Sequence, residues 1–362
     1  MKKRWIFGTL GLIFVVVFSF LSKPQTPSTE QSSSQCKQLK ILVTHKQGIG
    51  EREMAERIRR ASPHLNIDCR VLTLTQITRF KEIAKRLTHY FVNSFEPDLV
   101  LSLEGGKHEF TQAKKYAAMT HGSDYYFSQY SKLPFERLCH YDGYLVSFPD
   151  RGTLKSYFAL SSHKCQYMNW YSTCSQTEFK PPKNRHLFYC GNNMANTSYG
   201  LLYKVLFSML DQTGYLKVYG DKNQWLHTPK SYKGFIKHDG ESIINTIHNC
   251  GIALVLHAPD HFLGETPTAR IFEAAAASSI IITDRHPFIE THFKSSVLYI
   301  DRSSSKEMFD QINAHMQWIN THPKEAIELA RKSHEIFTMN FTLEKQLNSL
   351  LFLHETIKKA DL

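Results

Sequence analysis

The sequence predicts an α/β protein that contains two successive parallel β-sheets. Short apolar runs alternate with helical segments along most of the chain, which is typical of strands that helices cover on both faces. The alternation stops in SQTEFKPPKNR (175–185), where polar residues and paired prolines mark a boundary, and then begins again. A chain of 362 residues is long enough for two packed domains.

The first unit is expected to begin with a strand, a glycine turn and a helix. LKILVTH (39–45) is apolar and rich in β-branched residues, and KQGIG (46–50) follows it. In EREMAERIRRA (51–61) the apolar residues recur at helical spacing. PDLVLSLEGG (97–106) and YDGYLVSF (141–148) are predicted to be further strands of the same sheet.

The second unit repeats this arrangement. YGLLYKVLFSMLDQTG (199–214) is predicted to be a helix that a glycine ends, and residues 323–359 are helical by periodicity. Pro323 opens the first of these terminal helices, and Thr342 is the expected cap of the next. The predicted strands are RHLFYCGNN (185–193), YLKVYG (215–220), GIALVLHA (251–258), SIIITD (279–284) and SVLYID (296–301).

The N-terminus is expected to be a membrane anchor. MKKR precedes an uncharged apolar run, residues 5–22, that is near the lower length limit for a membrane-spanning helix. We therefore predict an anchor over 1–22, a flexible polar stem over 23–38 and a type II topology with a cytoplasmic N-terminus. A cleaved signal peptide is the alternative. This topology implies a Golgi-type lumen for a eukaryotic source and the inner membrane for a bacterial one.

Charge and cysteine content narrow the classes of partner. The net charge of +11 is spread along the chain without a basic block, which favours an anionic ligand or surface over nucleic acid. A soluble basic surface is the alternative. The 7 cysteines form no C-x-x-C pair, so we expect no zinc site and mostly reduced thiols, with a disulfide or two as the alternative in an oxidising lumen.

The stretch GETPTARIFEAAAASSIIITD (264–284) carries the predicted ligand site. Ligands of open parallel sheets bind at the carboxyl ends of the strands, where helix N-termini present free amides to anions. Thr266 is the expected cap and Pro267 the first-turn residue of a helix that follows the strand at 251–258. Glu265 then lies at the mouth of the helix, and Glu273 lies about two turns inside it.

A diphosphate suits the amides of Thr266 to Thr268, with Arg270 as a charge partner one turn deeper. Taken singly, each glutamate has a simpler interpretation. Glu265 would be a carboxylate that the helix dipole favours. Glu273 would be a structural acid paired with Arg270.

The spacing of Glu265 and Glu273 resembles the E-x7-E motif of GT-B glycosyltransferases. The resemblance extends from about residue 140 to the C-terminus and is only general before that. Further segments are similar, in the same order, to a bacterial-type branch of the family: CGNN (190–193), YGDKNQW (219–225), YKGFIKHDG (232–240), LVLHAPDH (254–261) and TDRHPFI (283–289).

The resemblance implies the GT-B fold, with two Rossmann-like domains and a cleft between them. The acceptor domain would span 39–180, the nucleotide-sugar donor domain 185–340, and a terminal helix, 341–362, would be available to cross back to the first domain. The implied activity is transfer of a hexose-type sugar from a nucleoside diphosphate sugar to a glycan, lipid or protein hydroxyl group, with retention. No cofactor is implied, because the nucleotide sugar is itself the substrate.

The resemblance also implies roles for single residues. Glu265 and Arg270 would be catalytic. The donor would contact Gly191, Asn192, Gly234, Phe235, Ile236, Thr266, Thr268 and Glu273. Apart from the resemblance, Gly48, Gly105, Gly106 and His108 follow predicted strands and are expected on the acceptor side. The alternatives are an ordinary strand-to-helix turn at 46–50 and a solvated loop at 104–109. No metal ligand is expected, because the chain contains no Asp-x-Asp triplet.

One departure from the family leaves the cation at the diphosphate open. Many E-x7-E enzymes place an arginine and a lysine after the first strand of the donor domain, but here Asn192 and Asn193 follow Gly191. Arg270, Lys204 and Lys222 are the alternatives. His257 and His261 are four residues apart, with Asp260 between them, and on a helix this spacing would suggest metal ligands. Pro259 places these residues in a loop, so the spacing does not indicate a metal site.

Three other functions remain open at this point. A sugar-nucleotide epimerase uses the same fold and donor pocket but needs no acceptor. A non-catalytic carbohydrate-binding module would bind glycans without nucleotide affinity. A pseudo-enzyme would bind the nucleotide through Glu273 without turnover.

Overall fold

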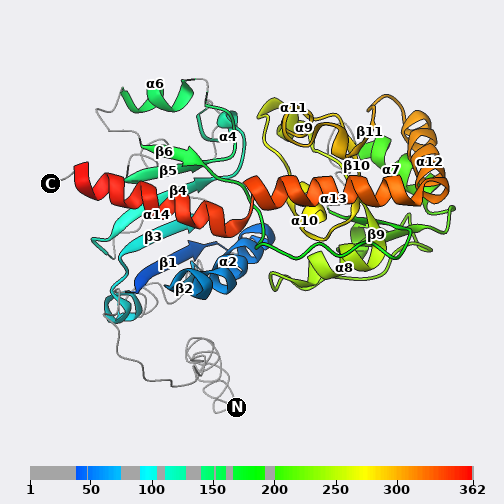
Figure 1. The fold of residues 1–362 in the computed structure, drawn as a ribbon. Helices are drawn as coiled ribbons and strands as arrows, with labels where there is room; N and C mark the ends of the chain where they lie inside the picture. Colours follow the sequence, from blue (N-terminus) through cyan, green and yellow to red (C-terminus); the bar gives the residue numbers. More distant parts are fainter. Residues whose placement is uncertain are drawn as a thin grey trace, which may run out of the picture. The chain divides into compact units, whose positions relative to one another are not determined.

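The computed structural model describes residues 38–46, 48–74, 90–103, 111–127, 140–150, 152–159, 166–191 and 200–360. Residues 39–362 form one compact unit, separate from residues 1–38. All the elements described below belong to that unit (Figure 1).

The first sheet has six parallel strands in the order β2-β1-β3-β4-β5-β6. The central strand β1 pairs with β2 on one side, with Leu39 opposite Ile67, and with β3 on the other, with Ile41 opposite Leu99. The strands are β1 (Leu39–His45), β2 (Ile67–Thr73), β3 (Leu99–Leu103), β4 (Lys114–Met119), β5 (Gly143–Val146) and β6 (Tyr167–Asn169).

Alternate residues of β1 pack into different cores because successive side chains of a strand point to opposite faces. Ile41 and Val43 join one core with the helix α2 (Ile49–Ala61). Leu42 joins another with residues 92–100. The near-continuous apolar runs in β1 and β3 follow from this burial on both faces. Two short helices, α4 (Ser123–Phe127) and α6 (Thr153–Ala159), also belong to this half of the chain.

The second sheet has five parallel strands in the order β11-β10-β9-β7-β8. Its two faces also pack into separate cores; Phe188 and Ala253 face one, and Leu187 and Ile252 face the other. The strands are β7 (His186–Cys190), β8 (Leu216–Tyr219), β9 (Gly251–Val255), β10 (Ile280–Asp284) and β11 (Leu298–Ile300). The helices are α7 (Gly200–Leu210), α8 (Ser242–Cys250), α9 (Pro259–Leu263), α10 (Ala269–Ala276), α11 (Pro287–His292) and α12 (Ser305–Thr321), with short 3-10 turns at η2 (Lys222–Gln224) and η3 (Lys294–Ser296). A further 3-10 turn, η1 (Ser62–Leu65), lies between α2 and β2 of the first sheet.

The last two helices pack against different sheets. Helix α13 (Pro323–Asn340) contacts α10 and β10 of the second sheet. Helix α14 (Leu343–Ala360), whose Lys345 amide donates to the Thr342 hydroxyl oxygen at 3.4 Å, contacts α2, β5 and β6 of the first. Figure 1 shows α14 beside the strands of the first sheet. We call the first sheet with its helices and α14 the N-terminal half, and the second sheet with α7 to α13 the C-terminal half.

The predicted class, α/β with two parallel sheets, is confirmed. Three strands were missed, for identifiable reasons. β2 is an edge strand that carries Asp68 and Arg70, and β4 begins with two lysines. β6 is a mostly exposed edge strand of three residues. None of these has the long apolar run that identifies a strand buried on both faces.

The prediction of a single-pass type II membrane protein is corrected. Among the residues that the structure describes, no helix combines the length and the apolar character that crossing a bilayer requires. The expected anchor, 1–22, and nearly all of the expected stem, 23–38, lie outside the described residues.

We expect the contact between α14 and the first sheet to contribute strongly to stability. Leu347 is fully buried in the core that contains Ile41, so Leu347→Ala should lower the free energy of unfolding by about 2–5 kcal/mol. Phe352→Ala on the same helix is the matched control, because Phe352 is 77% exposed. Urea denaturation of both variants tests this; equal midpoints would contradict the packing of α14 described here.

Candidate functional site

The loop after β9 leads into helix α10 at the carboxyl edge of the second sheet. Thr268 is the N-cap of α10, and its hydroxyl oxygen accepts from the Arg270 amide at 3.5 Å. The helix therefore begins at Ala269, which corrects the predicted cap at Thr266. Thr266 is instead buried, with its hydroxyl donating to the Gly264 carbonyl at 3.2 Å. Glu273 lies in the second turn of α10, closer to the helix N-terminus than predicted.

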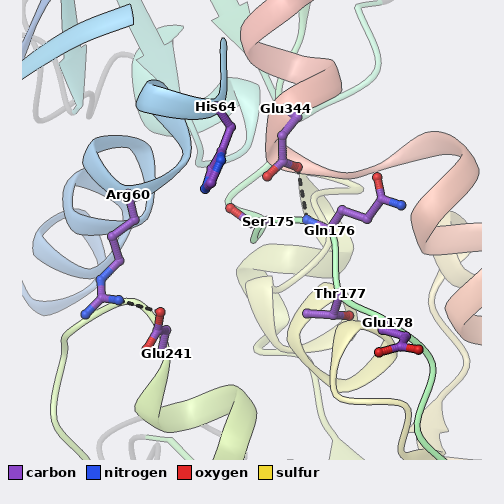
Figure 2. A pocket seen from close by; sticks show the side chains of 8 residues that line it. All are labelled: Arg60, His64, Ser175, Gln176, Thr177, Glu178, Glu241 and Glu344. Atoms are coloured by element: carbon purple, nitrogen blue, oxygen red, sulfur yellow. Dashed lines mark hydrogen bonds and ion pairs between the residues drawn. The ribbon is translucent and has the colours of Figure 1, made fainter. Parts of the chain in front are cut away.

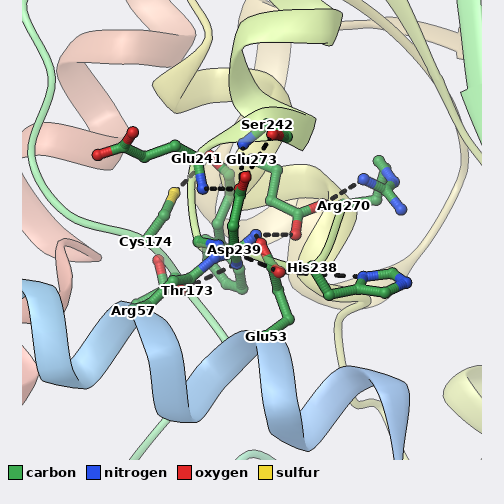
Figure 3. Close-up of polar contacts among 12 residues, drawn as sticks. Glu53, Arg57, Thr173, Cys174, His238, Asp239, Glu241, Ser242, Arg270 and Glu273 are labelled. Carbon is green, nitrogen blue, oxygen red and sulfur yellow. Dashed lines mark hydrogen bonds and ion pairs between the residues drawn. The ribbon is translucent and has the colours of Figure 1, made fainter. Parts of the chain in front are cut away.

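Glu273 lies between two arginines. Its Oε2 accepts from Arg270 Nη1 at 2.5 Å, within α10, and its Oε1 accepts from Arg57 Nη2 at 2.5 Å. Arg57 belongs to α2 of the N-terminal half, so this carboxylate joins the two halves (Figure 3). Only 4% of Glu273 is exposed. A carboxylate this deeply buried requires such charged partners, because an unpaired buried charge is strongly unfavourable.

Arg57 was not predicted as a site residue. Its Nη2 also donates to Glu53 Oε1 at 3.0 Å, and its Nη1 donates to the Thr173 carbonyl at 3.1 Å. In the sequence Arg57 is one of four arginines in an amphipathic helix, where the ordinary interpretation is a solvated charge. The only local signal is Glu53 one turn earlier, and that spacing is also common on exposed helix faces.

Arg270 connects Glu273 to the end of strand β7. Its Nη2 donates to the Cys190 carbonyl at 3.1 Å, and its guanidinium lies over the Phe188 ring, 5.6 Å from the ring centre. Cys190 immediately precedes Gly191, one of the predicted donor residues. The structure therefore brings the end of β7 and the first turns of α10 to one place.

Glu53 extends the network to the N-terminus of α8. Its Oε2 accepts from the Gly240 amide at 3.2 Å and lies 3.9 Å from His238 Nδ1 (Figure 3). Gly240 has φ +86, a conformation that L side chains rarely adopt. A Cβ at this position would lie 3.3 Å from Arg60 Cδ and 3.4 Å from Arg57 Cγ, so this loop packs against α2.

The electrostatic balance keeps Glu273 ionised. Burial alone would raise its pKa, but the charges of Arg270 and Arg57 outweigh burial and lower it. Burial is likewise the largest effect on the Arg57 pKa and lowers it, but Glu273, Cys174 and Glu53 together outweigh burial and raise it. Both groups are therefore charged at neutral pH.

Glu265 lies in the same loop with an unusual backbone. Its φ is +49, in the left-handed region that non-glycine residues seldom occupy. The preceding Gly264 touches the N-terminal half directly, since a Cβ built on Gly264 would lie 2.5 Å from the Cα of Gly122. The loop that carries Glu265 is thus packed against a residue just before α4.

The loop predicted to meet the base has one exposed aromatic residue. Phe235 is 62% exposed and makes an edge contact with His238, with ring centres 5.0 Å apart. Gly234 has φ +109, and its carbonyl accepts from the Gly220 amide at 3.0 Å. The Ile236 side chain belongs to the core of the second sheet, which leaves its backbone for any ligand contact.

The remaining predicted residues are less informative. Gly48 immediately precedes α2, and the side chains of Lys204 and Lys222 are exposed. The structure shows no contact between any of these three residues and Glu273. Asn192, Gly105, Gly106 and His108 lie outside the described residues. Of the cations considered from the sequence, only Arg270 contacts Glu273 among the residues described.

A histidine cluster braces the start of the loop from β9 to α10. His257 Nδ1 lies 2.7 Å from Asp284 Oδ1, and its ring stacks on His286 with centres 4.2 Å apart. His286 caps α11: its Nδ1 accepts from the Phe288 amide at 3.2 Å, and its Nε2 lies 3.1 Å from the His261 carbonyl. Within the described ranges no group of three or more His, Cys, Asp or Glu residues has a metal-binding arrangement, and Asp260 is exposed.

A cavity of about 770 Å³ opens elsewhere, beside the linker between the halves. Figure 2 shows its two internal contacts, the ion pair of Arg60 with Glu241 and the bond from the Gln176 amide to Glu344. None of the predicted donor or acceptor residues lines it. We therefore do not assign it to the sugar-nucleotide site.

We expect the histidine cluster to make stability depend on pH. Burial, together with the neighbouring His257, lowers the pKa of His261 and of His286 to about 4, against 6.5 for free histidine. The unfolded chain therefore takes up these protons first, and the free energy of unfolding should fall as pH decreases from about 6.5 to about 4.

His286→Asn tests this expectation, because an asparagine oxygen can replace Nδ1 as the α11 cap without titrating in that range. The free energy of unfolding, measured by urea denaturation, should depend less steeply on pH in this variant. The difference in slope should correspond to the uptake of about one proton fewer on unfolding than in the unmodified chain. An equally steep dependence in both proteins would show that His286 does not contribute to it.

The family model described as glycosyl transferase-like matches residues 204–351, which contain both Glu265 and Glu273. This match covers most of the C-terminal half. No curated protein matches the sequence.

Three solved structures illustrate the fold that this chain shares. A glycosyltransferase from Rickettsia africae superposes with a TM-score of 0.55 at 12% identity, over 89% of this chain and 99% of that chain. Sucrose-phosphate synthase from Thermosynechococcus elongatus superposes with a TM-score of 0.54 at 13% identity, over 89% of this chain and 100% of that chain. HepE from Anabaena, in complex with UDP-glucose, superposes with a TM-score of 0.53 at 12% identity, over 89% of this chain and 99% of that chain. At these identities the likeness establishes the fold. The family match shows that residues 204–351 are similar to the glycosyl transferase-like family, and the solved structures show that the chain shares their fold.

Proposed function

We propose that the chain transfers a sugar from a nucleoside diphosphate sugar to an acceptor hydroxyl group on a glycan, lipid or protein. The observation that carries the proposal is the arginine-held carboxylate of Glu273 at the carboxyl edge of the second sheet, beside the Thr268-capped start of α10. Ligands of open parallel sheets bind at this edge. The complex of HepE with UDP-glucose supports a UDP-linked donor as the first to test.

In this proposal Glu273 accepts hydrogen bonds from the ribose hydroxyl groups of the donor. An ionised carboxylate has about four acceptor positions, so two arginine contacts leave positions for a diol. The Thr268 amide at the start of α10 and the Arg270 guanidinium, which contacts Glu273, would face the diphosphate. The Thr266 amide donates to the His261 carbonyl at 3.0 Å, and Pro267 has no N–H. The exposed Phe235 and its loop backbone contact the base.

The chemistry needs little beyond charge stabilisation. The bond from the anomeric carbon to the diphosphate oxygen breaks, and the leaving diphosphate takes the electron pair. The acceptor oxygen forms the new bond to the anomeric carbon, and its proton passes to the leaving diphosphate. Arg270 and the amides at the start of α10 stabilise the negative charge that develops on the diphosphate, and the proposal requires no metal ion. Retention at the anomeric carbon is part of the same proposal.

Glu265 is assigned to the sugar ring. Its left-handed backbone costs on the order of 1–3 kcal/mol in a non-glycine residue, and such conformations cluster at functional sites. The loop around it is held by the Gly122–Gly264 contact and by the buried Thr266. This arrangement supports a carboxylate held in one position at the entrance to the helix.

The two glutamates should differ in what their loss affects. Glu273→Gln should weaken nucleotide-sugar binding at least about tenfold, because the neutral amide offers fewer acceptor positions and opposes two arginine donors. Glu265→Gln should leave the dissociation constant within about threefold but lower the transfer rate about a hundredfold. Calorimetry with UDP-glucose, GDP-mannose and ADP-glucose, followed by transfer and hydrolysis assays, measures both quantities.

Glu178→Gln is the matched control, since Glu178 is exposed and lies outside the proposed site. Product analysis separates transfer from epimerisation, which would change the nucleotide sugar without an acceptor, and also reports whether the anomeric configuration is retained. Unmodified binding and turnover in both glutamate variants would refute the assignment.

A further inference from the structure

We propose that Arg57 is a positioning residue of the donor site, supplied by the N-terminal half, and that the site is complete only when α2 is docked on the C-terminal half. This inference rests on the proposed function of Glu273. It concerns a residue outside the region that the family model matches, since that match begins at residue 204.

The contacts of Arg57 determine the orientation of the Glu273 carboxylate. One oxygen is held by Arg57 and the other by Arg270, so the plane of the carboxylate is defined by an arginine on each side. Arg57 is itself held by Glu53 and by the Thr173 carbonyl, and 3% of it is exposed. Because only a small part of Glu273 is accessible, its orientation decides whether two ribose hydroxyl groups can bond to it.

Arg57 also affects the charge of Glu273. The groups that act on this carboxylate come from each element around it: Arg57 and Glu53 from α2, Arg270 from α10, His238 from the loop before α8, and the thiols of Cys174 and Cys190. Burial raises the pKa of Glu273 and the two arginines lower it. Without Arg57, only Arg270 would oppose the effect of burial on the pKa of Glu273. Glu53 would remain nearby as a second buried carboxylate.

The docking of α2 depends on one face of that helix. Glu53, Arg57 and Arg60 follow one another at helical spacing, and each contacts the C-terminal half: the Gly240 amide, Glu273 and Glu241 respectively. Arg60 and Glu241 are largely exposed, so their pair contributes little. The buried contacts of Glu53 and Arg57 therefore dominate the polar docking of α2.

The test compares Arg57→Met, Arg57→Lys and Arg60→Met with the unmodified full chain. Methionine retains the aliphatic stem and removes the charge, whereas lysine retains the charge and loses the paired geometry. Arg60→Met removes a cross-half ion pair that does not touch Glu273, so it is the matched control. The probe is the first of UDP-glucose, GDP-mannose and ADP-glucose that the unmodified protein binds, measured by calorimetry between about pH 5.5 and 8.

We expect Arg57→Met to weaken binding at least about tenfold at pH 7.5, equivalent to about one charge-assisted hydrogen bond. Its affinity should fall further as pH decreases, because burial raises the pKa of Glu273 and only one arginine, Arg270, would then oppose it. The unmodified protein and Arg60→Met should show nearly constant affinity. Arg57→Lys should restore the constant pH profile with part of the affinity.

Several results would overturn the inference. These are unchanged affinity and pH profile in Arg57→Met, tighter binding in that variant, or a loss that Arg60→Met shares. If Arg57→Met does not fold, a steep loss of affinity below about pH 7 in the unmodified protein would overturn it instead, because Glu273 would then not be held ionised. Failure of the unmodified protein to bind any of the three probes would refute the proposed function itself, and the inference with it.

Discussion

A buried carboxylate held by an arginine from each half is the interaction on which the arrangement of this protein depends. Glu273 is nearly inaccessible to solvent and lies far from Arg57 in the sequence. A charge in such a place is tolerable only when its partners are fixed around it. This requirement fixes the position of α2 relative to α10 and to the Thr173 carbonyl, which lies between β6 and β7. Through Arg270 it also connects α10 to the end of β7.

The packing around this carboxylate depends on small residues. Ala274, Ala275 and Ala276 of α10 are buried in the core that also contains residues of α8 and α13, and they allow the three helices to approach closely. Gly240 allows its loop to reach α2, and Gly122 and Gly264 are in backbone contact. Larger side chains at these positions would separate the elements that carry Glu53, Arg57 and Glu273.

The charge balance of the network has a consequence for ligand binding. Two carboxylates, Glu53 and Glu273, are matched by two guanidinium groups, Arg57 and Arg270, so the network is formally neutral. A neutral network does not by itself attract a diphosphate. In the proposed function, that attraction comes from the amides at the start of α10 and from Arg270, whose Nε–H has no hydrogen-bond partner among the described residues.

The sequence by itself determined the two parallel sheets, most of the buried strands and the placement of Glu265 and Glu273 in one loop and helix. These features follow from local patterns: apolar runs, glycine and proline punctuation, and the short spacing of a motif. The same patterns failed at the edge strands β2 and β6 and at the internal strand β4, which begins with two lysines, because none of them has a long apolar run.

Only the tertiary structure decided which cation from the other half meets Glu273. Arg57 and Glu273 are 216 positions apart, and nothing in a charged amphipathic helix distinguishes an arginine that crosses to another sheet from one that faces water. The left-handed conformation of Glu265 and the cap at Thr268 were decided in the same way. Each depends on how distant segments meet in space, which local sequence patterns do not encode.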